Sequence, residues 1–141
     1  MPFQIHRVQV WSGVIPDRPG AAAAKLEALA RAGADLEFVF TRPDRKDPDT
    51  TRIFLAPISG PEQTAAAQQA GLAPAPDIAM LCVEGDNRPS TSYEIMSRLA
   101  VAGINLRGIS VSSLGHRFAA YLAFDNPDVA TLALQVLVTV E

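Results

Sequence analysis

The stretch RPGAAAAKLEALARAGADL, Arg18–Leu36, returns 70 residues later as RPSTSYEIMSRLAVAGINL, Arg88–Leu106. Seven of the nineteen aligned positions are identical, and the alignment needs no gap. Self-similarity of this kind over the length of a helix indicates an internal repeat. The chain is therefore expected to contain two copies of one unit, joined by the Ala/Pro-rich segment AGLAPAPD, residues 70–77.

The second copy shows the order of elements more clearly. A compact apolar run at 77–84 predicts a buried strand. Pro89 suits the first turn of a helix, which Asp86 or Asn87 could cap and Gly103 could end. Two strands follow, at 104–113 (with a possible bulge at Gly108) and 117–124. A second helix is then expected from its apolar face, which runs from Val129 to Leu137.

The first copy repeats this order. Its expected elements are a strand at 5–14, a helix at 19–32, strands at 35–41 and 51–58, and a helix at 61–69. Each copy still needs a fourth strand, for which 77–84 and 136–141 are candidates, so the copies could share or exchange strands. The predicted class is α+β, with two ferredoxin-like βαββαβ repeats, antiparallel sheets and helices on one face. The expected domains are 1–72 and 77–141.

Composition narrows the classes of function. The 141 residues are 48% hydrophobic and 19% charged, which is typical of a globular protein. The net charge of −3 and the lack of a Lys/Arg cluster argue against a nucleic-acid partner. No apolar run approaches the length of a membrane span, and the N-terminus does not resemble a signal peptide, so we expect a cytoplasmic protein without a membrane partner.

Residues that could carry chemistry are few. A single cysteine, Cys82, allows no intrachain disulfide, argues against a Cys-based zinc site and is expected to be buried. His6 and His116 are isolated in the sequence, and no His/Asp/Glu cluster has the spacing of metal ligands. The serines at 90–92 and 112–113 have no evident base. We therefore expect no catalytic residue, no metal and no cofactor.

Four short motifs give the chain a family resemblance. PDRPG (16–20) and DNRPS (86–90) lie at the first strand–helix turn of each copy, and ARAGADL (30–36) and AVAGINL (100–106) end the helix that follows. In these motifs and in its order of elements the chain resembles a tandem ACT-domain protein without an attached enzyme. The resemblance implies a regulatory module that binds a small molecule, usually an amino acid.

The resemblance also implies where the ligand lies, since ACT domains pair side by side and bind ligands near the first strand–helix turn. Carried over to this sequence, the ligand-binding residues are Ile15, Pro16, Asp17, Arg18, Pro19, Gly20, Gly85, Asp86, Asn87, Arg88, Pro89 and Ser90. Ser90 departs from the glycine usual there. A helix N-terminus suits a ligand carboxylate, and Asp17, Asp86 or Asn87 could accept from its ammonium group.

Other interpretations stay open. Capping and corner geometry alone could explain the two turns, with Arg18 and Arg88 merely exposed. The chain could instead be a structural or partner-binding subunit without a ligand, or a small enzyme on a ferredoxin-like fold. We expect a homodimer, because sheets of this type often leave exposed edges, and a regulated enzyme or regulator protein as a possible partner.

Overall fold

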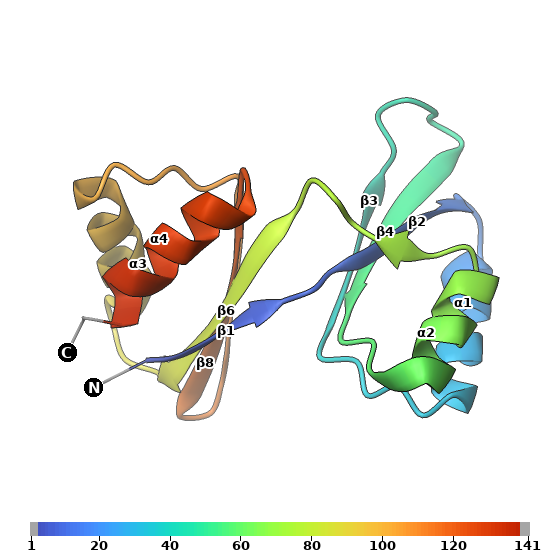
Figure 1. The fold of residues 1–141 in the computed structure, drawn as a ribbon, viewed down its shortest axis with the longest axis horizontal. Coiled ribbons are helices and arrows are strands. Elements are labelled where there is room, and N and C mark those ends of the chain that lie inside the picture. Colours follow the sequence, from blue (N-terminus) through green and yellow to red (C-terminus); the bar gives the residue numbers. More distant parts are fainter. Residues whose placement is uncertain (1–2, 139–141) are drawn as a thin grey trace. The chain divides into compact units, whose positions relative to one another are not determined.

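The computed structural model describes residues 3–138 and divides into two compact units (Figure 1). The first-repeat unit comprises Gln9–Ala75. The second-repeat unit comprises the residues from Pro76 onward together with those up to Val8. Each unit has one four-stranded antiparallel sheet and two helices, which confirms the predicted α+β class with ferredoxin-like repeats.

The first-repeat unit has the sheet order β3-β4-β2-β5. Its elements are β2 (Trp11–Pro16), α1 (Ala21–Arg31), β3 (Phe38–Pro43), β4 (Thr50–Ala56), α2 (Gly60–Gln69) and the two-residue β5 (Ala73–Pro74). Trp11, Ile53 and Leu55 line one face of the sheet and pack with Leu29 of α1 and Leu72. The helices therefore bury the apolar side of a sheet whose residues alternate between two faces.

The second-repeat unit has the sheet order β1-β6-β8-β7. Its elements are β1 (Gln4–Val8), β6 (Ala79–Asp86), α3 (Thr91–Val101), β7 (Gly108–Leu114), β8 (Arg117–Phe124) and α4 (Pro127–Val138). Every second residue of β8 is buried, from Phe118 to Phe124, as are Leu81 and Val83 of β6. These side chains pack against Ile95 and Leu99 of α3 and against Ala130, Ala133 and Leu137 of α4.

The N-terminal strand belongs to the second repeat. The single strand expected at 5–14 is two strands, and Gln9 and Val10 separate them. β1 pairs antiparallel with β6, whereas β2 pairs with β4 and β5 (Figure 1). β1 thus supplies the fourth strand of the second-repeat sheet, and β5 supplies that of the first. A strand therefore passes from the N-terminus to the other repeat, but the expected candidate 77–84 is not the fourth strand of the first copy, because it forms β6 of the second-repeat sheet. The repeat limits 1–72 and 77–141 stay a prediction.

Three local predictions were wrong. Residues 136–138 continue α4 rather than forming a strand, and 139–141 lie outside the described residues. Gly108 opens β7 in unbroken register with Ala123, so there is no bulge. Asp86 and Asn87 do not cap α3, whose N-cap residue is Ser90, because the chain makes a further turn between the strand and the helix. No described helix is long and apolar enough to cross a membrane.

Candidate functional site

The two candidate turns have the same backbone course. In the first-repeat unit, β2 ends at Pro16 and α1 begins at Ala21; in the second, β6 ends at Asp86 and α3 begins at Thr91. The N-cap residues Gly20 and Ser90 both have left-handed backbone conformations, with φ of 86° and 76°. Neither helix receives a side-chain hydrogen bond at its N-cap, so first-turn N–H groups of both helices lack a side-chain acceptor.

Backbone hydrogen bonds tie each turn to a neighbouring loop. The Asp17 N–H donates to the Asp49 carbonyl at 2.9 Å, and the Asn87 N–H donates to the His116 carbonyl at 2.6 Å. Asp49 and His116 each precede the strand that pairs with the strand before the turn. Each turn is therefore held to the sheet through the residue that precedes the adjacent strand.

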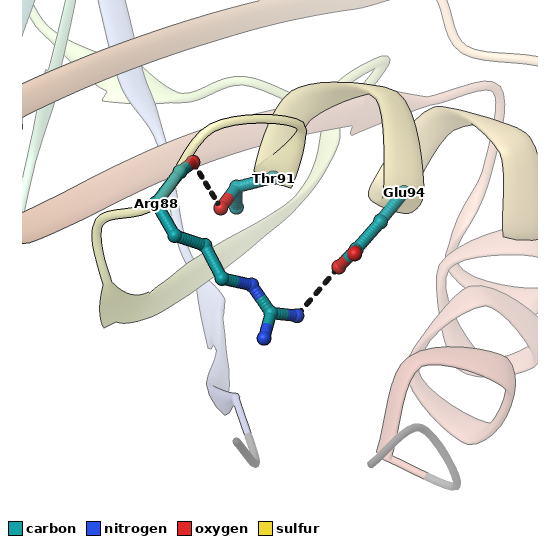
Figure 2. Close-up of polar contacts among 3 residues, drawn as sticks. All are labelled: Arg88, Thr91 and Glu94. Atoms are coloured by element: carbon teal, nitrogen blue, oxygen red, sulfur yellow. Dashed lines mark hydrogen bonds and ion pairs between the residues drawn. The ribbon is translucent and has the colours of Figure 1, made fainter.

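The second turn contains its own ion pair. Arg88 donates to the Glu94 carboxylate at 2.6 Å, and the Thr91 hydroxyl donates to the Arg88 carbonyl at 2.9 Å (Figure 2). Thr91 is buried, whereas Arg88 and Glu94 remain partly exposed. The Asp86 carboxylate also pairs, with Arg117 of β8 at 3.1 Å. Charged side chains of this turn are thus neutralised by groups of the same unit.

The first turn has no such partners. Neither Asp17 nor Arg18 makes a side-chain hydrogen bond or ion pair with any described residue. No acidic residue lies in the first turn of α1, where Ala24 occupies the repeat position of Glu94. A Cβ atom built on Gly20 would meet nothing within 4 Å. An arginine, an open N-cap position and a helix N-terminus without an acid therefore lie together at this turn.

The predicted site residues do not all lie at the surface of the turns. Ile15 is buried in the core of the first-repeat unit. A Cβ on Gly85 would lie 2.9 Å from the Phe118 ring, so this glycine is needed for packing. Pro19 and Pro89 precede the N-cap residues instead of opening the helices. Ile15 and Gly85 support the turns from within the core, and the accessible candidates are the residues that follow them.

Three residues that organise the second turn were not among the predicted site residues. Thr91, Glu94 and Arg117 make the side-chain contacts that organise it. Glu94 carried a usable signal, since it is an acid in the first turn of a helix that follows an arginine. Arg117 carried none, because its contact with Asp86 depends on the pairing of β6 with β8.

Comparisons with solved structures show the fold. Protein BT0572 from Bacteroides thetaiotaomicron is similar over 93% of this chain and 88% of its own, with a TM-score of 0.76 and 11% identity. The ligand-free regulatory subunit of aspartate kinase from Thermus thermophilus is similar over 97% of this chain and 95% of its own, with a TM-score of 0.66 and 19% identity. The regulatory subunit of aspartate kinase from Thermus flavus is similar over the same shares of both chains, with a TM-score of 0.56 and 20% identity. No family model and no curated protein sequence matched.

The fold and its repeat therefore define the class: the chain has the tandem ACT fold, as expected from its motifs. Two of the similar structures are separate regulatory subunits of nearly the same extent as this chain. The similarity covers at least 93% of this chain and therefore both repeats.

Proposed function

We propose that this protein is a non-catalytic regulatory module that binds a small molecule with an amino-acid head group. The observation that carries the proposal is the unpaired Arg18 beside the N-terminus of α1. The first turn of this helix contains no acidic residue that could pair with Arg18. The tandem ACT fold supports it, since two proteins of that fold are regulatory subunits of aspartate kinase.

The chemistry of the first turn suits a carboxylate. Arginine presents a planar fork of donors that matches a carboxylate, and the N–H groups and dipole of a helix N-terminus also favour negative charge. The Asp17 carboxylate, one residue from Arg18, could accept from a ligand ammonium group. The two charged groups of an amino acid would thus meet two charges of opposite sign on adjacent residues.

We further propose that the two turns differ in occupancy. Glu94 already supplies a carboxylate to Arg88, as a ligand would supply one to Arg18. A partly exposed ion pair contributes only about 1 kcal/mol or less, but a ligand at the second turn would first have to displace it. The first turn therefore binds more tightly, and the second turn is filled from within.

Regulation needs a second surface. We propose that the chain acts as a homodimer or through a partner enzyme or regulator protein, because β7 is an edge strand exposed along its whole length. Ile109 and Val111 are about 40% exposed there. Ile109 and Val111 pair with Leu122 and Ala120, whose side chains point into the core. Ile109 and Val111 therefore lie on the helix-covered side of the sheet at its open edge, where a second chain could cover them.

The first experiment is a thermal-shift screen of the intact protein against the twenty amino acids at millimolar concentration. A ligand at 100 times its dissociation constant adds about 2.7 kcal/mol to the free energy of unfolding, which raises the Tm by several degrees. We expect a selective shift for one amino acid or a few related ones. If no amino acid raises the Tm, the amino-acid proposal is wrong, and a structural or partner-binding subunit becomes the better interpretation.

Matched variants locate the site. Arg18→Gln should remove the shift, and Ala24→Glu should remove it as well, because it installs the acid that fills the second turn. Arg88→Gln is the control and should leave the shift unchanged. A shift that survives both first-turn substitutions would place the ligand elsewhere.

A further inference from the structure

A cluster of three different metal-binding side chains lies on the second-repeat sheet, away from both candidate turns. The register of β1 on β6 places His6 directly opposite Cys82. Glu84 lies two residues further along β6 and therefore on the same face as Cys82. Leu81 and Val83, which alternate with these two residues along β6, point into the core, so the cluster occupies the face opposite the helices.

The three donor atoms converge. An imidazole nitrogen of His6, the Cys82 Sγ and a Glu84 carboxylate oxygen all lie within 4.8 Å of one another. Two ligands of a tetrahedral zinc ion, at bond lengths of roughly 2.0–2.3 Å, lie about 3.3–3.8 Å apart. Small side-chain rotations would thus close the set around one ion, without movement of the strands.

The burial of the three residues is graded. Cys82 is buried, Glu84 is intermediate and His6 is exposed, so an ion could enter from the side of the histidine. The nearest cation on β1 does not interfere, since the Arg7 guanidinium donates to the Thr131 hydroxyl of α4, on the opposite face of the sheet. On the face of the cluster itself, the Arg117 guanidinium pairs with the Asp86 carboxylate and donates to the Gln4 side chain, so both arginines are engaged by other groups.

From this arrangement we propose a binding site for a divalent transition-metal cation, with Zn²⁺ as the ion that fits best. One imidazole, one thiolate and one carboxylate are the ligand types of zinc sites, with water completing the fourth position. Magnesium and calcium, which take oxygen ligands, do not fit this donor set. On binding, Cys82 loses its thiol proton to solvent as the metal–sulfur bond forms.

The site joins two segments that are far apart in the sequence. His6 belongs to the N-terminal strand β1, and the other two ligands belong to β6. A bound ion would therefore fasten residues 4–8 to the second-repeat sheet. This proposal is independent of the amino-acid proposal, because it uses no residue of either turn.

The test is a titration of the reduced, metal-free full chain with Zn²⁺, followed by calorimetry and by Tm. We expect one ion per chain and a higher Tm with Zn²⁺ but not with Mg²⁺. Titration with Co²⁺ should produce the sulfur-to-cobalt charge-transfer absorption of a thiolate ligand. Failure to bind Zn²⁺ at a one-to-one ratio would overturn the proposal.

Variants assign the ligands. His6→Gln and Glu84→Gln should each weaken Zn²⁺ binding at least tenfold, and Cys82→Ala should remove the Co²⁺ charge-transfer band. His116→Gln, which alters the other histidine of the chain, is the matched control and should bind like the parent protein. Because His6 and Glu84 lie on the open face, their variants remain informative even if Cys82→Ala fails to fold. Zn²⁺ binding that is unchanged in both would overturn the assignment.

Discussion

Ser90 is the one residue other than glycine that has a positive φ within the described chain. In the first repeat Gly20 takes the same conformation without a Cβ penalty. A left-handed conformation costs an L-residue about 1–2 kcal/mol, and a glycine loses about 0.5–1 kcal/mol more backbone entropy on folding. The two turns thus adopt the same left-handed conformation, with backbone strain at Ser90 and a larger loss of backbone entropy at Gly20.

We predict that Ser90→Gly raises the free energy of unfolding by about 0.5–1 kcal/mol, because relief of the left-handed strain exceeds the added entropy cost. Urea denaturation of the two proteins measures the difference. Ser92→Gly is the control: it lies within α3, where glycine should lower stability instead. A Ser90→Gly protein that is less stable than its parent would show that the serine side chain contributes to the turn.

Residue-scale chemistry also separates what the motifs could and could not predict. The repeated Arg-Pro pairs marked both turns correctly, since they fall between a strand and a helix in each unit. The prediction that Asp86 caps the helix was wrong, because the N-cap residue is Ser90, whereas Asp86 ends the preceding strand and its carboxylate pairs with Arg117 of another strand. A sequence shows which neighbours a residue has along the chain, but the sheet decides which charge faces it.

At the scale of the elements, the edge strand β7 is the surface that we propose for contact with a second chain. Its seven residues are all exposed, and it has a hydrogen-bonded neighbour on one side only. Exposed edge strands are templates for pairing with a second chain. The proposed homodimer would use this edge.

We predict that Val111→Lys shifts the protein from dimer to monomer. Pairing of two chains along β7 would bury the lysine charge without a partner, which costs free energy and weakens the dimer. Size-exclusion chromatography with light scattering measures the mass. Val39→Lys is the matched control: it lies on β3, the edge strand of the first-repeat sheet, where Val39 is similarly exposed. A dimer that persists in Val111→Lys would exclude the β7 edge as the dimer contact.

At the scale of the whole molecule, the pairing of β1 with β6 predicts that β1 unfolds together with the second-repeat unit. β1 hydrogen-bonds to β6, so its amides should exchange with solvent when the second-repeat unit opens. Leu81→Ala and Leu55→Ala each remove a fully buried side chain, from the second- and first-repeat core respectively. Each should destabilise its own unit by about 2–5 kcal/mol.

Hydrogen exchange followed by mass spectrometry tests the prediction. Leu81→Ala should speed exchange of residues 4–8, whereas Leu55→Ala should leave them protected and speed exchange of β2 and β4. The opposite result would mean that β1 follows the first-repeat unit, contrary to its pairing.

The local elements and the repeat could be predicted from the sequence, because apolar periodicity, Gly33 and Gly103 after the helices, and the paired motifs are short-range signals. Which sheet receives residues 4–8 could not, since an apolar alternating segment fits either sheet and only tertiary pairing selects one. The same pairing brings His6 to Cys82 across 76 residues, which no ligand spacing could indicate. The sequence by itself thus determined the two units and their turns. The tertiary structure decided that β1 joins the second-repeat sheet, that an ion pair fills one turn and that three metal-binding side chains meet. Each of these depends on contacts between distant strands or on side-chain geometry.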